Sequence, residues 1–224
     1  MSTLGSYTLF HYTRRIEWLK DILSNGFHHY RIAEKIPGRH LGYITNGICF
    51  CNIPLSNIEQ HTDWYGEYGI GLKRHELKKY GCSPVIYTHT SSPFLVSGSS
   101  YKAKNWYRDN PLLTSFIKRN EGKQRKPPFR KRQYKDFTKE MEWRIVSGIV
   151  DVYQISNLDE LKELDAPKNT ADNIILTPNM IEYIILSKKD EVGPFCKWLD
   201  DTFPKDYLDY TTKIITLPQI LKDF

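Results

Sequence analysis

The hydrophobic period of this chain changes repeatedly between that of a helix and that of a strand, and this restricts the fold more than any other feature. Runs rich in β-branched and aromatic residues predict strands at residues 6–13 and 47–53 and a strand-rich segment at residues 137–153. Apolar residues at helical spacing predict a helix within residues 14–24. No internal repeat or heptad pattern is visible, which excludes solenoids and coiled coils. Strands and helices do not alternate strictly, so we predict an α+β fold rather than a doubly wound parallel sheet.

Length and composition favour a single soluble domain. The chain has 224 residues, of which 40% are hydrophobic and 13% aromatic, as in globular proteins. We expect one domain over residues 1–224. No apolar run approaches the ~20 residues that cross a bilayer, and no signal peptide is evident. The four cysteines form no paired zinc pattern and no dense disulfide framework, so a cytoplasmic location with reduced thiols is the simplest interpretation.

Positive charge is concentrated in one segment. The formal net charge is +6, and much of the excess lies in IKRNEGKQRKPPFRKRQYK, which predicts a basic loop insertion at about residues 118–135. Such a loop attracts polyanions, so RNA or single-stranded DNA is a candidate partner. The basic residues expected to contact nucleic acid are Lys126, Arg130, Lys131 and Arg132. The alternative is a solvated insertion without a ligand.

Local signals place the first elements of the chain. Asn25-Gly26 predicts the end of the first helix, because glycine is favoured just beyond a helix C-terminus. Residues 28–46 combine glycine, proline and mixed charge without a clear period, which predicts a surface loop over the site that the first strand helps to form.

Three sequence blocks together resemble a known family. They are FHYT at residues 10–13, CFCNIPLSNIEQHTDWYGEYGIGL at 49–72 and EMEWRIV at 140–146. In this order they are similar to the AbiGi family of abortive phage resistance proteins. They also resemble ADP-ribosyltransferase folds, and the opening FHYTRRIEWLKDILSNGF is similar to the start of DarT-like nucleic-acid ADP-ribosyltransferases. This second resemblance implies a split, mixed and antiparallel β-sheet with flanking helices, and it is a fold-level analogy.

The ADP-ribosyltransferase resemblance implies a catalytic carboxylate at Glu142. Cleavage of NAD passes through a cation-like ribose, which a carboxylate can stabilise. Glu140 lies two residues earlier, would share the face of Glu142 on a strand, and is implied to position the acceptor. The alternative interpretations are that Glu142 is paired with Arg144 or a lysine, and that Glu140 is an exposed surface charge.

The same resemblance implies that NAD is bound as a substrate by residues from two blocks. His11 and Thr13 would contact the ribose, and Tyr68 would stack on the nicotinamide ring. The full NAD-binding set is His11, Tyr12, Thr13, Arg14, Tyr65, Tyr68 and Gly69. The alternatives are that His11 is a hydrogen-bonded core residue and that Tyr68 packs in the core. No Rossmann or P-loop motif and no zinc spacing is present, so we predict no metal.

Two functions compete on these grounds. The first is an NAD-dependent ADP-ribosyltransferase toxin of an anti-phage system, which modifies nucleic acid. The second, implied by the AbiGi resemblance, is a non-catalytic antitoxin that binds and neutralises a nucleotidyltransferase-like toxin. A metal-dependent nuclease using Glu140, Glu142 and an aspartate has weaker support, because no second acidic cluster stands at an obvious spacing.

Overall fold

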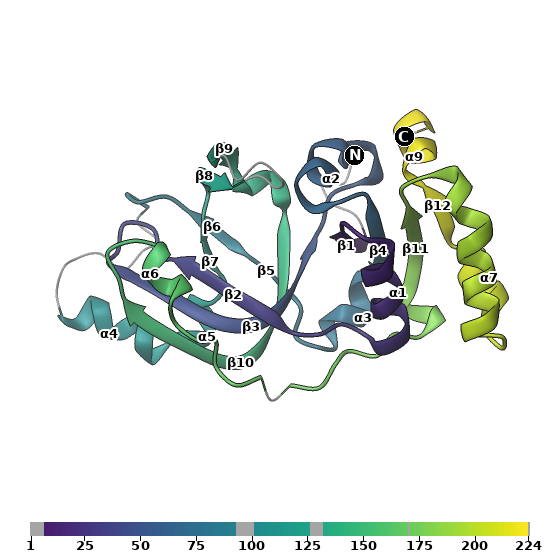
Figure 1. Cartoon of the computed structure of the whole chain (residues 1–224). Coiled ribbons are helices and arrows are strands. Elements are labelled where there is room, and N and C mark those ends of the chain that lie inside the picture. Colours follow the sequence, from purple (N-terminus) through teal and green to yellow (C-terminus); the bar gives the residue numbers. More distant parts are fainter. Residues whose placement is uncertain (1–6, 93–100, 126–131, 170, 224) are drawn as a thin grey trace. The chain divides into compact units, whose positions relative to one another are not determined.

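The computed structural model of the chain describes residues 7–92, 101–125, 132–169 and 171–223 (Figure 1). Its contacts divide the chain into two compact units, each assembled from separate stretches of sequence. Unit 1 comprises Met1–His28, Phe50–Tyr80 and Asn173–Phe224, and unit 2 comprises His29–Cys49 and Gly81–Asp172. Parallel and antiparallel strands occur with flanking helices, which confirms the predicted α+β class.

In the described residues of unit 1, the strands β12, β11, β4 and β1 lie side by side in this order. They are β1 (Thr8–Thr13), β4 (Tyr68–Lys73), β11 (Ile181–Leu186) and β12 (Ile214–Thr216). Strand β4 is antiparallel to β1 and to β11, whereas β11 and β12 are parallel. On its other side β1 pairs with the end of β3, where Phe10 is opposite Cys51.

The helices of unit 1 flank this sheet. They are α1 (Ile16–Asn25), α2 (Glu59–Tyr65), α3 (Arg74–Lys78), α7 (Val192–Thr202), α8 (Tyr207–Thr211) and α9 (Leu217–Asp223), with 3-10 turns η1 (Leu55–Asn57), η3 (Pro178–Met180) and η4 (Lys189–Glu191). The predicted end of α1 is confirmed, because Gly26 has a φ of 77° and its N–H donates to the carbonyl of Ile22. A Cβ at this position would also lie 2.4 Å from the Ile174 carbonyl oxygen, so Gly26 allows a close backbone approach.

Unit 2 contains a sheet in the order β2-β3-β10-β5, with two small two-stranded sheets, β6-β7 and β8-β9. The strands are β2 (Tyr30–Lys35), β3 (Leu41–Cys51), β5 (Ser83–Pro84), β6 (Ile86–Thr88), β7 (Ile117–Arg119), β8 (Glu121–Arg125), β9 (Arg132–Asp136) and β10 (Glu142–Gln154). The helices are α4 (Tyr101–Asp109), α5 (Pro111–Thr114) and α6 (Asp159–Lys162), with the 3-10 turn η2 (Phe137–Glu140). The basic segment at residues 118–135 therefore carries strand residues at both ends.

The prediction of a surface loop at residues 28–46 was wrong. Strands β2 and β3 occupy most of this segment and pair in antiparallel register from Tyr30 with Gly47 to Lys35 with Gly42. The two glycines accommodate close packing rather than a turn. A Cβ on Gly42 would lie 2.6 Å from Ile155 Cδ1, and one on Gly47 would lie 2.4 Å from the Ile145 carbonyl oxygen.

Both faces of the sheet of unit 2 are covered by hydrophobic clusters. One cluster joins Ile32, Leu41 and Tyr43 to Tyr107 and Ile117, with Val150 and Val152 packed against it. The other joins Ile44 to Ile155 and Leu161, with Tyr153 packed against it. Among the described residues, no helix is both long and apolar enough to cross a membrane.

Candidate functional site

A cluster of six charged side chains lies in unit 2, and we call it the buried charge cluster. Its members come from strands and turns far apart in the sequence: Glu34 (β2), Lys118 (β7), Lys135 (β9), Glu140 (the end of η2), and Glu142 and Arg144 (β10). Three carboxylates and three cations cancel in formal charge. Such groups are costly to bury unless they are paired, and here every member has a partner of opposite sign.

The ammonium of Lys118 is the centre of the cluster. Its Nζ lies 2.7 Å from Glu140 Oε2 and 2.6 Å from Glu142 Oε2, with Glu34 Oε1 at 3.7 Å. The two nearer carboxylates do not converge by strand alternation, because Glu140 is in a 3-10 turn and only Glu142 is in β10. Met141 between them has a left-handed φ of 43°, which redirects the backbone from the turn into the strand.

Arg144 holds the second oxygen of Glu142. The two residues are two apart on β10 and share a face, so Arg144 Nε donates to Glu142 Oε1 at 2.5 Å. The remaining guanidinium nitrogens donate to the hydroxyl of Tyr43 at 2.6 Å, the Ser115 carbonyl at 2.8 Å and Glu34 Oε1 at 3.2 Å. Arg144 is only 1% exposed, and these bonds satisfy most of its donors.

The surroundings keep these groups charged. Burial on its own raises the pKa of Glu142, but the adjacent Arg144 guanidinium and Lys118 ammonium outweigh it and hold that pKa well below the usual glutamate range. The pKa of Glu140 is also lowered, because Lys118 and Lys135 outweigh the effect of burial. Burial would lower the pKa of Lys118, but the surrounding carboxylates raise it well above its ordinary value. The Glu142 carboxylate is therefore ionised near neutral pH, and its charge is balanced by Arg144 and Lys118.

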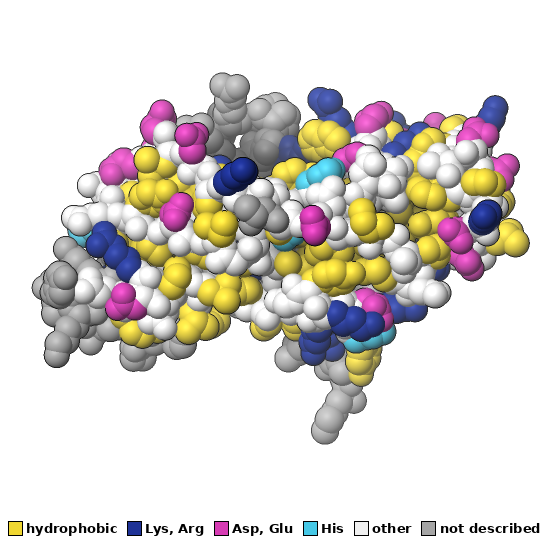
Figure 2. All heavy atoms as spheres, turned by 90° about the horizontal axis from the view of Figure 1, so that it is seen from below, with side chains coloured by type: hydrophobic (Ala, Val, Ile, Leu, Met, Phe, Trp, Pro, Cys, Tyr) yellow, Lys and Arg dark blue, Asp and Glu magenta, His cyan; other side chains and the backbone are white. Residues whose placement is uncertain are grey.

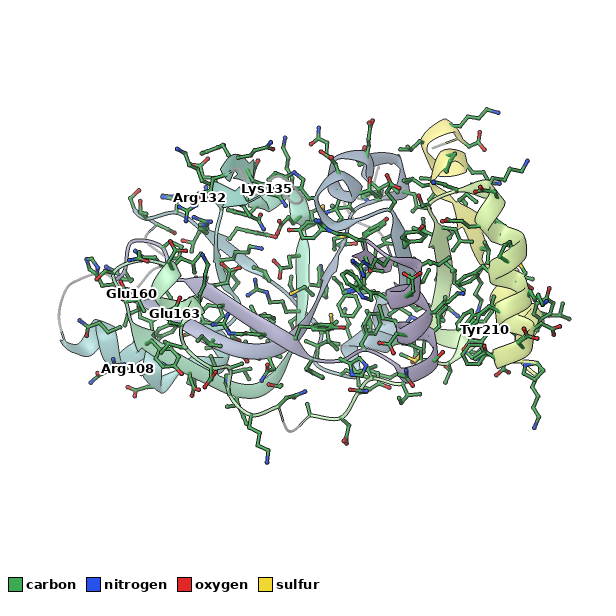
Figure 3. The ribbon with its side chains drawn as sticks, in the orientation of Figure 1. Arg108, Arg132, Lys135, Glu160, Glu163 and Tyr210 are labelled. Carbon is green, nitrogen blue, oxygen red and sulfur yellow. The ribbon has the colours of Figure 1, made fainter. Side chains whose placement is uncertain are left out.

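Lys135 ties the β8-β9 hairpin to the cluster. Its Nζ lies 2.6 Å from Glu140 Oε1. Burial lowers the pKa of Lys135 although Glu140 acts in the opposite direction. The ring of Phe137 contacts the cations Lys118, Arg119 and Lys135, at 4.9–6.0 Å from the ring centroid. Figure 3 labels Lys135 and Arg132, which both belong to β9.

The residues expected at the first strand lie in unit 1. His11 is half-buried between aromatic rings, with centroid distances of 5.1 Å to Phe27 and 6.0 Å to Phe50, both edge-on. Thr13 is buried on the same face of β1, and among the described residues its hydroxyl has no hydrogen-bond partner. The aromatic contacts are those of the alternative interpretation, in which His11 packs in the core.

The opposite face of β1 explains the glycines of β4. Tyr12 is buried, and a Cβ on Gly69 would lie 2.8 Å from its Cε1 atom. Gly71 relates to Phe10 in the same way, at 2.7 Å. The YGIGL glycines thus make room for two aromatic rings of the neighbouring strand. Burial, with a smaller contribution from Cys51, raises the pKa of Tyr12 well above its ordinary value.

The other expected NAD-binding residues of unit 1 contact protein groups. Tyr65 packs on His61, with ring centroids 4.5 Å apart. The guanidinium of Arg14 donates to the backbone carbonyl of Trp64. The Tyr68 hydroxyl donates to Glu191 Oε1 at 2.6 Å, and burial together with this carboxylate raises the pKa of Tyr68 to about 12.

The predicted basic contact residues fall largely outside the described part of the chain. Lys126, Arg130 and Lys131 lie in residues 126–131, outside the described ranges. Arg132 is exposed, and its guanidinium lies 3.2 Å from Asp159 Oδ2. Within residues 7–92, 101–125, 132–169 and 171–223, no group of three or more His, Cys, Asp or Glu could hold a metal ion.

The structure brings Glu140 and Glu142 together, whereas His11 and Tyr68 belong to the other unit. Sequence reasoning considered Arg144 as a partner of Glu142 but missed Lys118 as the shared partner of both glutamates. Lys118 stands at the start of the basic segment, 22 residues before Glu140, and no local pattern distinguishes it from solvated lysines.

The fold and the side-chain contacts define the chain as an α+β protein with a buried charge cluster in unit 2. A family model described as "Putative abortive phage resistance protein AbiGi, antitoxin" matches residues 44–187. Because this match covers more than half of the sequence, the chain belongs to the AbiGi family. No curated protein and no solved structure matches the chain, so the ADP-ribosyltransferase-like fold stays a prediction.

The family description contradicts our prediction of an ADP-ribosyltransferase toxin. It names an antitoxin of abortive phage resistance, which agrees with the alternative that the AbiGi resemblance implied. An antitoxin implies a cognate toxin as partner. Turnover of NAD and contact with RNA or single-stranded DNA stay predictions from the sequence.

Proposed function

We propose that this chain is the antitoxin of an abortive-infection pair and neutralises its toxin by binding it in the cytoplasm. The observation that carries the proposal, beside family membership, is the state of Glu142. Its side chain is 7% exposed, and both carboxylate oxygens are bonded to cations. Stabilising a cationic sugar requires negative charge that is not already neutralised, so this carboxylate fits a structural role better than a catalytic one.

The charge of the chain supports a protein partner with an acidic surface. Unit 2 contains 19 Lys and Arg and 12 Asp and Glu, a net charge of +7, whereas unit 1 contains 13 and 14, a net charge of −1. The positive excess thus belongs entirely to unit 2, which contains most of the residues matched by the family model. Charge complementarity accelerates association and selects partners. A nucleotidyltransferase-like toxin with an acidic face is the partner that this proposal favours.

Co-expression tests this proposal. Each gene that flanks this one in its genome would be induced in bacteria with and without the chain. We expect one flanking product to arrest growth alone, and the chain to restore growth and co-elute with it at a fixed stoichiometry. Growth arrest caused by the chain itself, with no flanking product neutralised, would refute the proposal.

The variant Glu142→Gln distinguishes toxin binding from NAD turnover in the same assay. Glutamine preserves the shape of the side chain and one acceptor oxygen but removes the charge that pairs with Lys118 and Arg144, so the variant should be less stable, and its folded, soluble fraction should still restore growth. Far-ultraviolet circular dichroism and soluble yield establish that the variant is folded. Loss of neutralisation by a folded Glu142→Gln chain would contradict a purely structural role for this carboxylate.

A further inference from the structure

Strand β10 has a long edge without a paired strand. It has 13 residues, but its neighbour β5 has only 2 and pairs with Trp143 and Arg144 alone. On the side away from β3, residues 145–154 have no strand partner within the described ranges of the chain. We call this side of residues 145–154 the open edge. It presents backbone N–H and C=O groups that a further strand could bond.

The direction of the backbone identifies the groups on the open edge. The Ile149 carbonyl accepts a bond from Thr45 Oγ1 of β3 at 2.6 Å, and the Ile155 N–H donates to the His40 carbonyl at 3.0 Å. Odd-numbered residues from Ile149 to Ile155 therefore direct their backbone groups toward β3. Because successive residues of a strand alternate, residues 150, 152 and 154 direct theirs outward, whereas the positive φ of Gly148 (91°) interrupts the alternation before Ile149.

Apart from the positive φ of Gly148 (91°), the open edge lacks the usual protection against pairing. Residues 145–154 read IVSGIVDVYQ, with five β-branched aliphatic residues, a single charge at Asp151, and neither lysine nor proline. Isolated edges normally carry such residues or are very short. Ile149 is 39% exposed, although hydrophobic clusters cover both faces of the sheet. Because both faces are covered, a partner strand can be added to this sheet only at the open edge.

Electrostatics favours a different protein over a second copy as the occupant. A second copy would bring another unit of net charge +7 against the first, which is unfavourable at ordinary ionic strength. An acidic partner surface around the added strand would complement the positive charge of unit 2 instead, since the only charge within residues 145–154 is Asp151. Figure 2 shows one face of the molecule, where acidic and hydrophobic side chains lie among the basic ones, so charge alone does not mark a docking surface there.

From these observations we propose that the open edge of β10 receives a strand of the toxin, which extends the sheet of unit 2. This inference rests on the proposed antitoxin function and adds the place and mode of binding. Main-chain bonds to residues 150–154 would supply affinity, and the side chains around Ile149 would supply specificity.

Two variants block the open edge in different ways, and the chain offers a matched control. Ile149→Lys places a charge beside the edge, and Val150→Pro removes an outward N–H without affecting the bonds to β3. Ile86→Lys is the control, because Ile86 belongs to the same unit, lies on β6 and is also 39% exposed. The partner is the growth-arresting flanking product identified by co-expression, and calorimetry measures its affinity for each chain.

We expect at least a tenfold loss of affinity for Ile149→Lys and Val150→Pro, and less than a twofold loss for Ile86→Lys. Amides of residues 150, 152 and 154 should become protected from hydrogen exchange only in the complex. Full affinity of both edge variants overturns the inference while leaving the antitoxin function intact. A wild-type dimer that Ile149→Lys dissociates would assign the edge to a second copy and also overturn it. If no flanking product is neutralised, the proposed function itself fails.

Discussion

Replacing Lys118 by methionine should destabilise the protein strongly at neutral pH. The change takes the buried charge cluster from a formal charge of zero to −1 and leaves two carboxylate oxygens without a cation at 2.6–2.7 Å. Removing one partner of a buried ion pair costs roughly 3–5 kcal/mol. Glu140 keeps Lys135 and Glu142 keeps Arg144, so we expect a value near the lower end, about 3 kcal/mol.

Urea denaturation followed by circular dichroism measures this loss. With a slope of about 2 kcal/mol per molar, the unfolding midpoint should fall by roughly 1.5 M. Lys139→Met is the control, because Lys139 is an exposed lysine on the same turn as Glu140, and its replacement should change stability by less than about 0.5 kcal/mol.

The pH dependence of the difference tests its electrostatic origin. In the wild-type protein the pKa values of Glu140 and Glu142 are lowered on folding. Their contribution to stability is therefore present above the unfolded value of about 4.3 and is lost as the pH falls toward the folded values. Without Lys118 both carboxyls take up protons more readily. The gap between wild type and Lys118→Met should narrow between pH 7 and pH 4. A gap below about 1 kcal/mol at pH 7, or one that is equal at both pH values, would refute the reasoning.

Two further predictions concern unit 1. Gly69→Ala should lower the free energy of unfolding by about 1–3 kcal/mol in urea denaturation, because its Cβ would lie 2.8 Å from the Tyr12 ring. Gly193→Ala in α7 is the control, because its Cβ would meet no atom within 4 Å, and it should stabilise the protein by up to ~1 kcal/mol. Equal effects of the two changes would contradict the packing argument. Tyr68→Phe removes the 2.6 Å hydrogen bond to Glu191 and should lower the free energy of unfolding by about 1–2 kcal/mol. In an ultraviolet titration, the variant should lack the tyrosine that ionises near pH 12. A titration curve unchanged near pH 12 would show that Tyr68 ionises at a different pH.

Local signals predicted the elements that depend on local chemistry. The helix α1 ends at Asn25-Gly26 as expected, because a glycine can take the positive φ that this ending requires. The strand that begins at Glu142 was expected from its β-branched and aromatic residues. In both cases a short stretch of sequence carries the whole physical reason for the structure.

Sequence reasoning failed where distant parts of the chain determine the structure. Strand β3 is buried along almost its whole length, so it shows no alternation, and Gly42 within residues 28–46 suggested a loop. The reason for this glycine is visible only when Ile155 lies against it. Lys118 was assigned to the basic loop insertion for the same reason, since the carboxylates that neutralise it are 22 and 24 residues further along the chain.

The open edge of β10 also bears on how much free protein a cell can hold. A β-branched strand with an edge that no other strand covers tends to aggregate when its concentration rises. On the proposed antitoxin function, we expect chains made in excess of the toxin to precipitate or to be degraded, whereas those in the complex persist. The supply of usable antitoxin would then follow the amount of toxin present, so that an interruption of protein synthesis, as during phage infection, would deplete the unbound reserve first.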